Sequence, residues 1–139
     1  MTVIQKKLVF KTLARQPYEF TSEVQEAVAA SEIKQGICHL FIQHTSASLM
    51  LCENADPDVR TDLETFMQSI APDGSPMFCH TTEGPDDMPA HIRTLITNVS
   101  LTIPITNSRC LLGTWQGIYL WEHRTSSYSR NVIMTLYGE

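Results

Sequence analysis

A series of short runs of strand-forming residues, with little between them, constrains the fold more than any other feature of the sequence. These runs occupy residues 3–12, 36–43, 47–52, 100–105, 113–121 and 130–137. Each is apolar or alternates apolar with polar residues, as expected of buried or half-buried strands. Strands that outnumber helices and follow one another are typical of α+β proteins. The sequence therefore predicts an α+β fold with mainly antiparallel pairing.

Three segments carry signals for the start of a helix. Asp56 followed by Pro57 is a strong one, because an aspartate side chain caps free N–H groups and proline suits the first helical position. The apolar stripe that should face the core from this helix is Val59, Leu63, Phe66, Met67 and Ile70. Residues 87–89 (Asp-Met-Pro) begin a second helix, and Ser22 with Gln25 fits a capping box for another. We therefore expect two or three helices.

Length and charge limit the class of protein. The chain has 139 residues, which fits a single domain spanning residues 1–139. The formal net charge is -5, so no broad positive field is available to bind nucleic acid or an anionic membrane. A small phosphorylated ligand is still compatible with this charge, since it needs only two or three well-placed basic side chains.

The cysteines and the apolar runs bear on the compartment. No apolar run approaches the roughly 18 residues that span a bilayer, and the first residues alternate apolar with polar instead of forming a signal-peptide block. The 4 cysteines lie far apart and include no C-x-x-C pair, which favours reduced thiols. We therefore expect a cytoplasmic protein without a membrane partner.

Three histidines, His44, His80 and His91, lie in polar segments at the ends of apolar runs. His80 belongs to an acidic loop and His91 to the first turn of a predicted helix, so the two can approach each other. Imidazole is the commonest metal ligand, and three imidazoles leave a position open for water or substrate. On the residues alone, a divalent-metal site and ordinary hydrogen-bonded or exposed histidines are equally supported. His39, inside an apolar run, is expected in the core.

Other polar side chains near these histidines allow more than one role. Asp58 and Asp62 lie one turn apart, so they either reach a pocket together or face water. Thr45, Ser46 and Ser48 follow the first of the three histidines. No G-x-S-x-G elbow or phosphate-binding glycine loop surrounds these hydroxyls. Hydrogen bonding is therefore expected of them rather than covalent catalysis.

Four motifs in fixed order resemble one known family across essentially the whole chain. They are QHTSASL (43–49), ENADPDVR (53–60), EGPDDMPAHI (83–92) and GTWQGIYLWEH (113–123). Together they closely resemble the YjbQ-like family, known as secondary thiamine-phosphate synthases. The resemblance implies a β-sandwich core, a homotrimer with sites near subunit contacts, and a bound divalent metal.

The resemblance also carries roles onto matching residues. It implies that His44, His80 and His91 are the site histidines, with Glu53, Asn54, Asp58 and Gln116 as polar neighbours. We therefore expect metal ligation by the three histidines, catalytic roles for Glu53, Asp58 and Gln116, and substrate contacts from Thr45, Ser46, Asn54 and Arg124. Many members of the family have a Phe-Asp-Gly-Pro-Arg type run after the residue matching Glu122, whereas this chain has His123-Arg124-Thr125. The positive charge of Arg124 would oppose a cation at His123. We therefore expect His123 at the rim of the site and not among the ligands.

The activity that the resemblance implies joins hydroxymethylpyrimidine diphosphate to thiazole phosphate and releases pyrophosphate. Such a step needs a metal ion and cationic side chains around the leaving pyrophosphate. Zinc is the first choice for the metal, with magnesium, manganese or nickel as alternatives. Two other functions fit the same residues. One is a metal-dependent hydrolase with Glu53 or Asp58 as general base, and the other is a non-enzymatic trimeric module that binds a metabolite or a metal.

Overall fold

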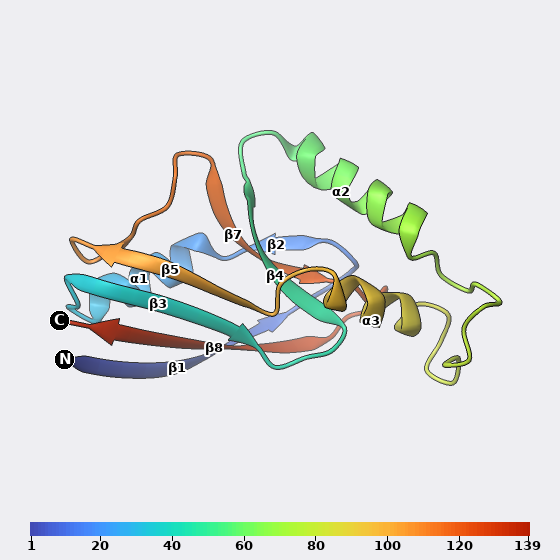
Figure 1. Cartoon of the computed structure of the whole chain (residues 1–139), viewed down its shortest axis with the longest axis horizontal. Helices are drawn as coiled ribbons and strands as arrows, with labels where there is room; N and C mark the ends of the chain where they lie inside the picture. Colours follow the sequence, from blue (N-terminus) through green and yellow to red (C-terminus); the bar gives the residue numbers. More distant parts are fainter.

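The computed structural model describes residues 1–139 and contains two antiparallel β-sheets (Figure 1). The first sheet has five strands in the order β1-β8-β3-β5-β6. Its strands are β1 (Thr2–Lys11), β3 (Gln35–Ile42), β5 (Ser100–Thr106), β6 (Arg109–Cys110) and β8 (Ser129–Gly138). The second sheet has three strands in the order β2-β7-β4, formed by β2 (Pro17–Glu19), β4 (Ala47–Glu53) and β7 (Gln116–Glu122).

The main core lies between these sheets. In β8 every second residue is buried, so one face points inward and the other faces out. Inward residues of β3 and β8 pack in one cluster with β7 residues and with Val24 and Val28 of helix α1 (Thr21–Ala30). The predicted α+β class with a largely antiparallel sheet structure is confirmed.

Helix α2 (Pro57–Ile70) covers the other face of β7. Its Met67 packs with Tyr119 and Trp121 in a second, smaller cluster. Asp56 caps this helix as predicted, because its Oδ1 accepts a hydrogen bond of 2.9 Å from the Asp58 N–H. The predicted apolar stripe is correct in part: Leu63 is half-buried and packs against the same cluster, and Val59 is half-buried, whereas Phe66 and Ile70 are 58% and 47% exposed. Figure 1 shows the reason: α2 projects beyond the sheets at one end.

Two further predictions about local structure need correction. Helix α1 has no side-chain cap, so the Ser22–Gln25 capping box is not formed. The Gln25 amide instead exchanges two hydrogen bonds with the backbone of Cys110. The short strands β2 and β6 were not anticipated, because two or three residues give no periodicity to read. All four cysteines are unpaired, and the structure has no helix of the length and apolarity that a bilayer span requires.

One end of the sheets gathers three connections. These are the β3–β4 turn, the β7–β8 loop and the long segment that leads into helix α3 (Asp87–Leu95). Strands β4 and β7 pair so that Ala47 opposes Glu122 at this end and Glu53 opposes Gln116 at the other. Seven residues of strand span roughly 20 Å. The two ends of this pair are therefore separate places on the molecule.

Candidate metal centre

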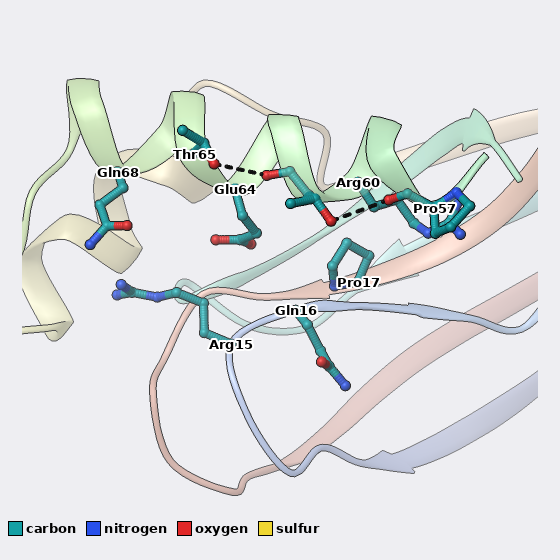
Figure 2. Close-up of a pocket in the computed structure, with 9 residues that line it drawn as sticks. Arg15, Gln16, Pro17, Pro57, Arg60, Glu64, Thr65 and Gln68 are labelled. Carbon is teal, nitrogen blue, oxygen red and sulfur yellow. Dashed lines mark hydrogen bonds between the residues drawn. The ribbon is translucent and has the colours of Figure 1, made fainter.

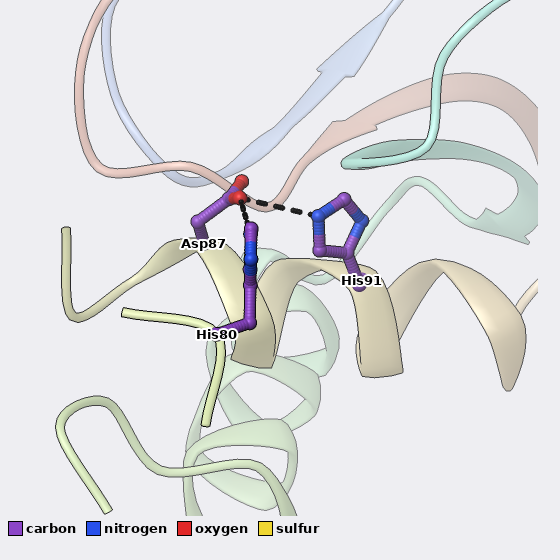
Figure 3. Close-up of side chains that lie close together, drawn as sticks. All are labelled: His80, Asp87 and His91. Atoms are coloured by element: carbon purple, nitrogen blue, oxygen red, sulfur yellow. Dashed lines mark hydrogen bonds and ion pairs between the residues drawn. The ribbon is translucent and has the colours of Figure 1, made fainter. Parts of the chain in front are cut away.

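His80, Asp87 and His91 form a compact group at the start of α3 (Figure 3). Asp87 and His91 are four residues apart on one helical face, and His80 approaches them from the preceding loop. The Asp87 Oδ2 lies 2.6 Å from His80 Nε2 and 3.1 Å from His91 Nε2. One ligand atom from each residue lies within 4.8 Å of the other two. Two imidazoles and a carboxylate at these separations suit zinc and related divalent ions.

The hydrogen bonds of His91 fix what its Nε2 can do. Its Nδ1 lies 3.0 Å from the Thr45 carbonyl oxygen, which accepts only, so Nδ1 carries a proton. The Nε2 then faces the Asp87 carboxylate either with a second proton or with a lone pair directed at a cation. A backbone carbonyl that binds the distal nitrogen of a histidine is the usual support of a metal ligand. His91 therefore has the orientation that a ligand needs.

Arg124 holds the carboxylates of this region in place. Its Nη1 lies 2.9 Å from Asp87 Oδ1, and its Nε donates to Asp86 Oδ2 at 2.8 Å. Burial acts to raise the pKa of Asp86, but hydrogen bonds from Arg124 and Thr125 and the charge of Arg124 outweigh it, and the pKa falls to about 2. The pKa of Asp87 is also lowered, because hydrogen bonding to His80 and the nearby Arg124 offset burial. Arg124 thus orients Asp87. Its Nη2 also donates to the Glu83 carbonyl, and its contact with substrate stays a prediction.

His44 lies outside the group, so the predicted set of three histidines is not assembled. Its Nε2 accepts a hydrogen bond of 2.7 Å from the Asn131 backbone N–H. The lone pair of that nitrogen is consequently used in a hydrogen bond and is not available to a metal. Burial and the charge of Arg130 lower the pKa of His44, which favours the neutral ring. Metal ligation by His80 and His91 stays a prediction, to which the structure adds Asp87.

The residues expected to be catalytic lie at the opposite end of the β4–β7 pair. Glu53 opposes Gln116 there, while the histidine group borders the end where Ala47 opposes Glu122. The Glu53 carboxylate accepts the backbone N–H of the α2 cap, and the Gln116 amide oxygen accepts a nearby backbone N–H. Asp58 is exposed on α2. A single chain therefore does not bring these groups to the histidines.

The predicted substrate contacts are divided in the same way. Asn54 is beside Glu53 and donates a hydrogen bond of 3.2 Å to Glu19. Ser46 is buried near the histidine end, where its hydroxyl accepts from Arg130 at 3.0 Å. Thr45 is exposed, and its carbonyl holds His91. Only Thr45 is thus available to a ligand beside the histidine group.

The environments predicted for the two remaining histidines, a rim for His123 and the core for His39, are both wrong. His123 is fully buried, not at a rim, and its Nε2 lies 2.8 Å from Ser48 Oγ. Its Nδ1 is buried without a hydrogen-bond partner. Burial and the charges of neighbouring arginines lower the pKa of His123 to about 3. His39 is not in the core, because its ring lies on the outer face of the five-stranded sheet and bonds Thr102 Oγ1 at 2.8 Å.

Sequence reasoning missed Asp87 as a possible ligand and Arg130 as a buried cation. Asp87 was expected to begin a helix and to belong to an acidic segment whose carboxylates could ligate a metal or orient a histidine, but it was not singled out, although the four-residue spacing to His91 places both on one face. Arg130 has the same parity in its strand as Val132 and Met134, which marks an inward position. A buried arginine needs a carboxylate partner, and Glu122 supplies it.

An open cleft of about 390 Å³ adjoins the histidine group. Its walls consist of His44, Thr45, His91, Thr94, Leu95, Thr97 and Val99. The cleft is large enough for a small metabolite. His44 and His91 both line this cleft, although His44 does not belong to the histidine group. The cleft and the histidine group thus share His91.

A second cleft, of about 430 Å³, lies between α2 and the segment before β2 (Figure 2). It is lined by polar residues, including Arg15, Arg60 and Glu64. The Arg15 guanidinium forms two hydrogen bonds with Asp73, at 2.8 and 2.9 Å, and Arg60 donates to the Glu53 carbonyl. Arg15 is thus already paired with a carboxylate, and none of the predicted site residues lines this cleft.

The fold and the histidine group define an α+β β-sheet protein with a candidate metal centre at one end of its sheets. The model of the family described as "UPF0047 protein YjbQ-like" matches residues 6–139. A UPF0047 protein of Synechocystis is 49% identical over 135 residues, covering 97% of this chain and 92% of that protein. YjbQ of Escherichia coli O157:H7 is 43% identical over 136 residues, covering 97% and 98%. The chain belongs to the YjbQ-like family.

Solved structures agree with the fold. A YjbQ/UPF0047 family protein from Clostridium acetobutylicum is 32% identical, with a TM-score of 0.86, and covers 95% of this chain and 99% of its own. A YbjQ-like protein from Sulfolobus solfataricus is 22% identical, with a TM-score of 0.90 and 99% coverage of both chains. The second likeness concerns the fold alone.

Proposed function

We propose that the protein is a divalent-metal-dependent enzyme of small phosphorylated metabolites, with the metal held by His80, Asp87 and His91. The observation that carries the proposal is the arrangement of His91. Its Nδ1–H is fixed on the Thr45 carbonyl, and its Nε2 faces the same carboxylate oxygen as His80 Nε2. When bound, zinc or a similar ion would neutralise phosphate charge beside the cleft. Magnesium, manganese and nickel are the other candidates.

The reaction we propose is that of a thiamine-phosphate synthase, as a secondary activity: hydroxymethylpyrimidine diphosphate and thiazole phosphate are joined, and pyrophosphate leaves. Support comes from the four motifs of the chain and its membership of the YjbQ-like family. The test is complementation of a bacterial strain that lacks its own thiamine-phosphate synthase. Growth without thiamine should depend on His91 and be lost in His91→Ala. No growth with the wild-type chain at high expression would reject this reaction.

A metal-dependent hydrolase and a non-enzymatic binding module use the same centre. The hydrolase is less well supported, because Glu53 and Asp58, its candidate general bases, belong to the far end of β4 and to α2. Purified metal-loaded protein can be assayed on phosphate and carboxyl esters to separate the two. Turnover that survives Glu53→Gln and Asp58→Asn would leave the hydrolase without its proposed base. Metabolite binding without any turnover would favour the binding module.

The proposal includes a homotrimer in the cytoplasm, with sites near the subunit contacts. Apolar side chains left on the outer face of the five-stranded sheet support a subunit contact there: Val3, Ile37, Phe41 and Tyr137 are 64%, 41%, 44% and 43% exposed. In the register of the sheet, Tyr137 is paired with both Val3 and Ile37, so these three form a continuous row. Light scattering coupled to size-exclusion chromatography tests the assembly. A mass of one chain at micromolar concentration would reject it.

A further inference from the structure

Arg130 is a buried cation whose Nη1 has no oxygen acceptor in the structure. The residue is 4% exposed. Its Nε and Nη2 donate to the two carboxylate oxygens of Glu122, at 2.8 and 2.5 Å, and Nη2 also donates to Ser46. Its Nη1 has a single neighbour at hydrogen-bonding range, the Nδ1 of His44, at 3.4 Å. An ion pair with Glu122 therefore fixes the guanidinium so that Nη1 points toward His44.

The tautomer of His44 decides whether this last contact is a hydrogen bond. A backbone N–H always donates, so the Asn131 N–H at 2.7 Å requires a lone pair on His44 Nε2. A neutral imidazole with a lone pair on Nε2 carries its proton on Nδ1. The Nδ1–H of His44 and the Nη1–H groups of Arg130 are then two donors facing each other with no acceptor between them.

We propose that His44 and Arg130 form an anion subsite, in which one phosphate group accepts a hydrogen bond from His44 Nδ1–H and another from Arg130 Nη1–H. Two converging donors, one of them a buried cation, are what a phosphate oxygen requires, and charge-assisted hydrogen bonds of this kind are among the strongest in proteins. The ring of His44 lines the cleft of about 390 Å³, so the proposed anion enters beside His44, while Arg130 is buried and does not line the cleft.

The position of this subsite agrees with the proposed function. That the bound anion is part of a substrate rests on that function. The next residue, Thr45, lines the same cleft and holds His91 through its carbonyl. A phosphorylated substrate could therefore contact the subsite with one group and the His80–Asp87–His91 centre with another. Arg130 directs its Nη1 toward this subsite, whereas Nε, Nη1 and Nη2 of Arg124 each contact an oxygen of the protein, on Asp86, Asp87 and the Glu83 carbonyl.

The matched test substitutes glutamine for histidine at two positions. In His44→Gln, the side-chain amide oxygen can replace Nε2 as the acceptor for the Asn131 N–H, while the Nδ1 donor is lost. His39→Gln makes the same change on the outer face of the five-stranded sheet, at a residue that does not line the cleft. Because the proposed subunit contact uses the same face, the mass of this variant is compared with that of the wild type by light scattering. Binding of inorganic phosphate is measured by calorimetry on the intact chain, with acetate as a second anion. We expect phosphate to bind His44→Gln roughly tenfold or more weakly, His39→Gln to match the wild type, and acetate to bind more weakly than phosphate.

The tautomer supplies a second measurement that needs no variant. Long-range proton–nitrogen correlation spectra of the wild-type chain should show His44 protonated at Nδ1, with that nitrogen shifting on addition of phosphate. A proton on Nε2, or equal phosphate affinities in wild type and His44→Gln, would overturn the subsite. Both measurements are made in the presence of a chelator and repeated with zinc. If the wild-type chain binds zinc but not phosphate, the subsite alone is rejected. If the wild-type chain binds phosphate but not zinc, the proposed metal centre alone is rejected.

Discussion

Acidification should destabilise the folded chain through His123, and the size of the effect follows from its burial. The ring is fully buried between arginines, and its pKa falls from 6.5 in the unfolded reference to about 3. A histidine whose pKa is lowered on folding contributes its full stabilisation above the unfolded value. That contribution is lost as the pH falls from about 6.5 toward 3, because only the unfolded chain takes up the proton.

The magnitude depends little on how low the folded pKa lies. Between pH 7.5 and 5.5 the unfolded chain becomes mostly protonated at this site, and the folded chain does not. The difference amounts to about 1.4 kcal/mol of unfolding free energy for one group. In His123→Gln this loss should be absent, since glutamine does not titrate. Ser48→Ala is the matched control: it removes the hydroxyl at 2.8 Å from Nε2 but keeps the imidazole, so its dependence on pH should persist.

Urea unfolding at the two pH values, followed by tryptophan fluorescence, measures the effect. Trp121 is a suitable reporter, because its ring lies 5.1 Å from that of His123. Chelator and a fixed protein concentration keep metal binding and assembly constant. The wild type should lose about 1.4 kcal/mol more than His123→Gln over this interval. Equal losses in the two proteins would refute a buried, neutral His123.

Three further predictions concern the other charged and apolar groups. Asp86 contributes stability that is lost as the pH falls from about 4 to 2, because its pKa is lowered from 3.8 to about 2; Arg124→Gln should remove most of this roughly 2 kcal/mol acid dependence, measured by thermal melts. Arg130→Met should lower the unfolding free energy by roughly 3–5 kcal/mol, because it leaves the Glu122 carboxylate buried without a cation. The double variant Arg130→Met/Glu122→Leu should recover most of this loss in urea titrations. An equal loss in the single and the double variant would show that the pair is not coupled. Phe66→Ser should change the unfolding free energy of a single chain by less than about 0.5 kcal/mol, because the side chain is 58% exposed, and a larger loss that grows with dilution would place this helix in a subunit contact.

Much of the fold could be predicted because its signals are local. Alternation marks β8, and an aspartate followed by proline marks the start of α2, where the Asp56 cap forms as expected. The apolar stripe of α2 was correct only in part, for a tertiary reason: Met67 and Leu63 pack in the second cluster, whereas Phe66 and Ile70 stay exposed because the helix projects past the sheets. Periodicity shows that a helix has an apolar face, but not how much partner surface that face will meet.

The candidate site was less predictable, because its hydrogen bonds join residues far apart in sequence. His80 and His91 were found from their polar surroundings. The role of His44 depends on Asn131, which lies 87 residues away and reaches it only through the register of the sheets. The separation of Glu53 from the histidines likewise follows from the length of β4, which a motif comparison does not reveal.

The most direct test of the metal centre is a crystal of the zinc-loaded chain, with anomalous scattering recorded at the zinc edge. An anomalous peak is expected roughly 2.0–2.2 Å from His80 Nε2, His91 Nε2 and a carboxylate oxygen of Asp87, with the Nε2 of His44 still accepting the Asn131 N–H. An occupied zinc site elsewhere in the chain, no peak at this group, or a zinc bound through His44 Nε2 would contradict the proposed centre.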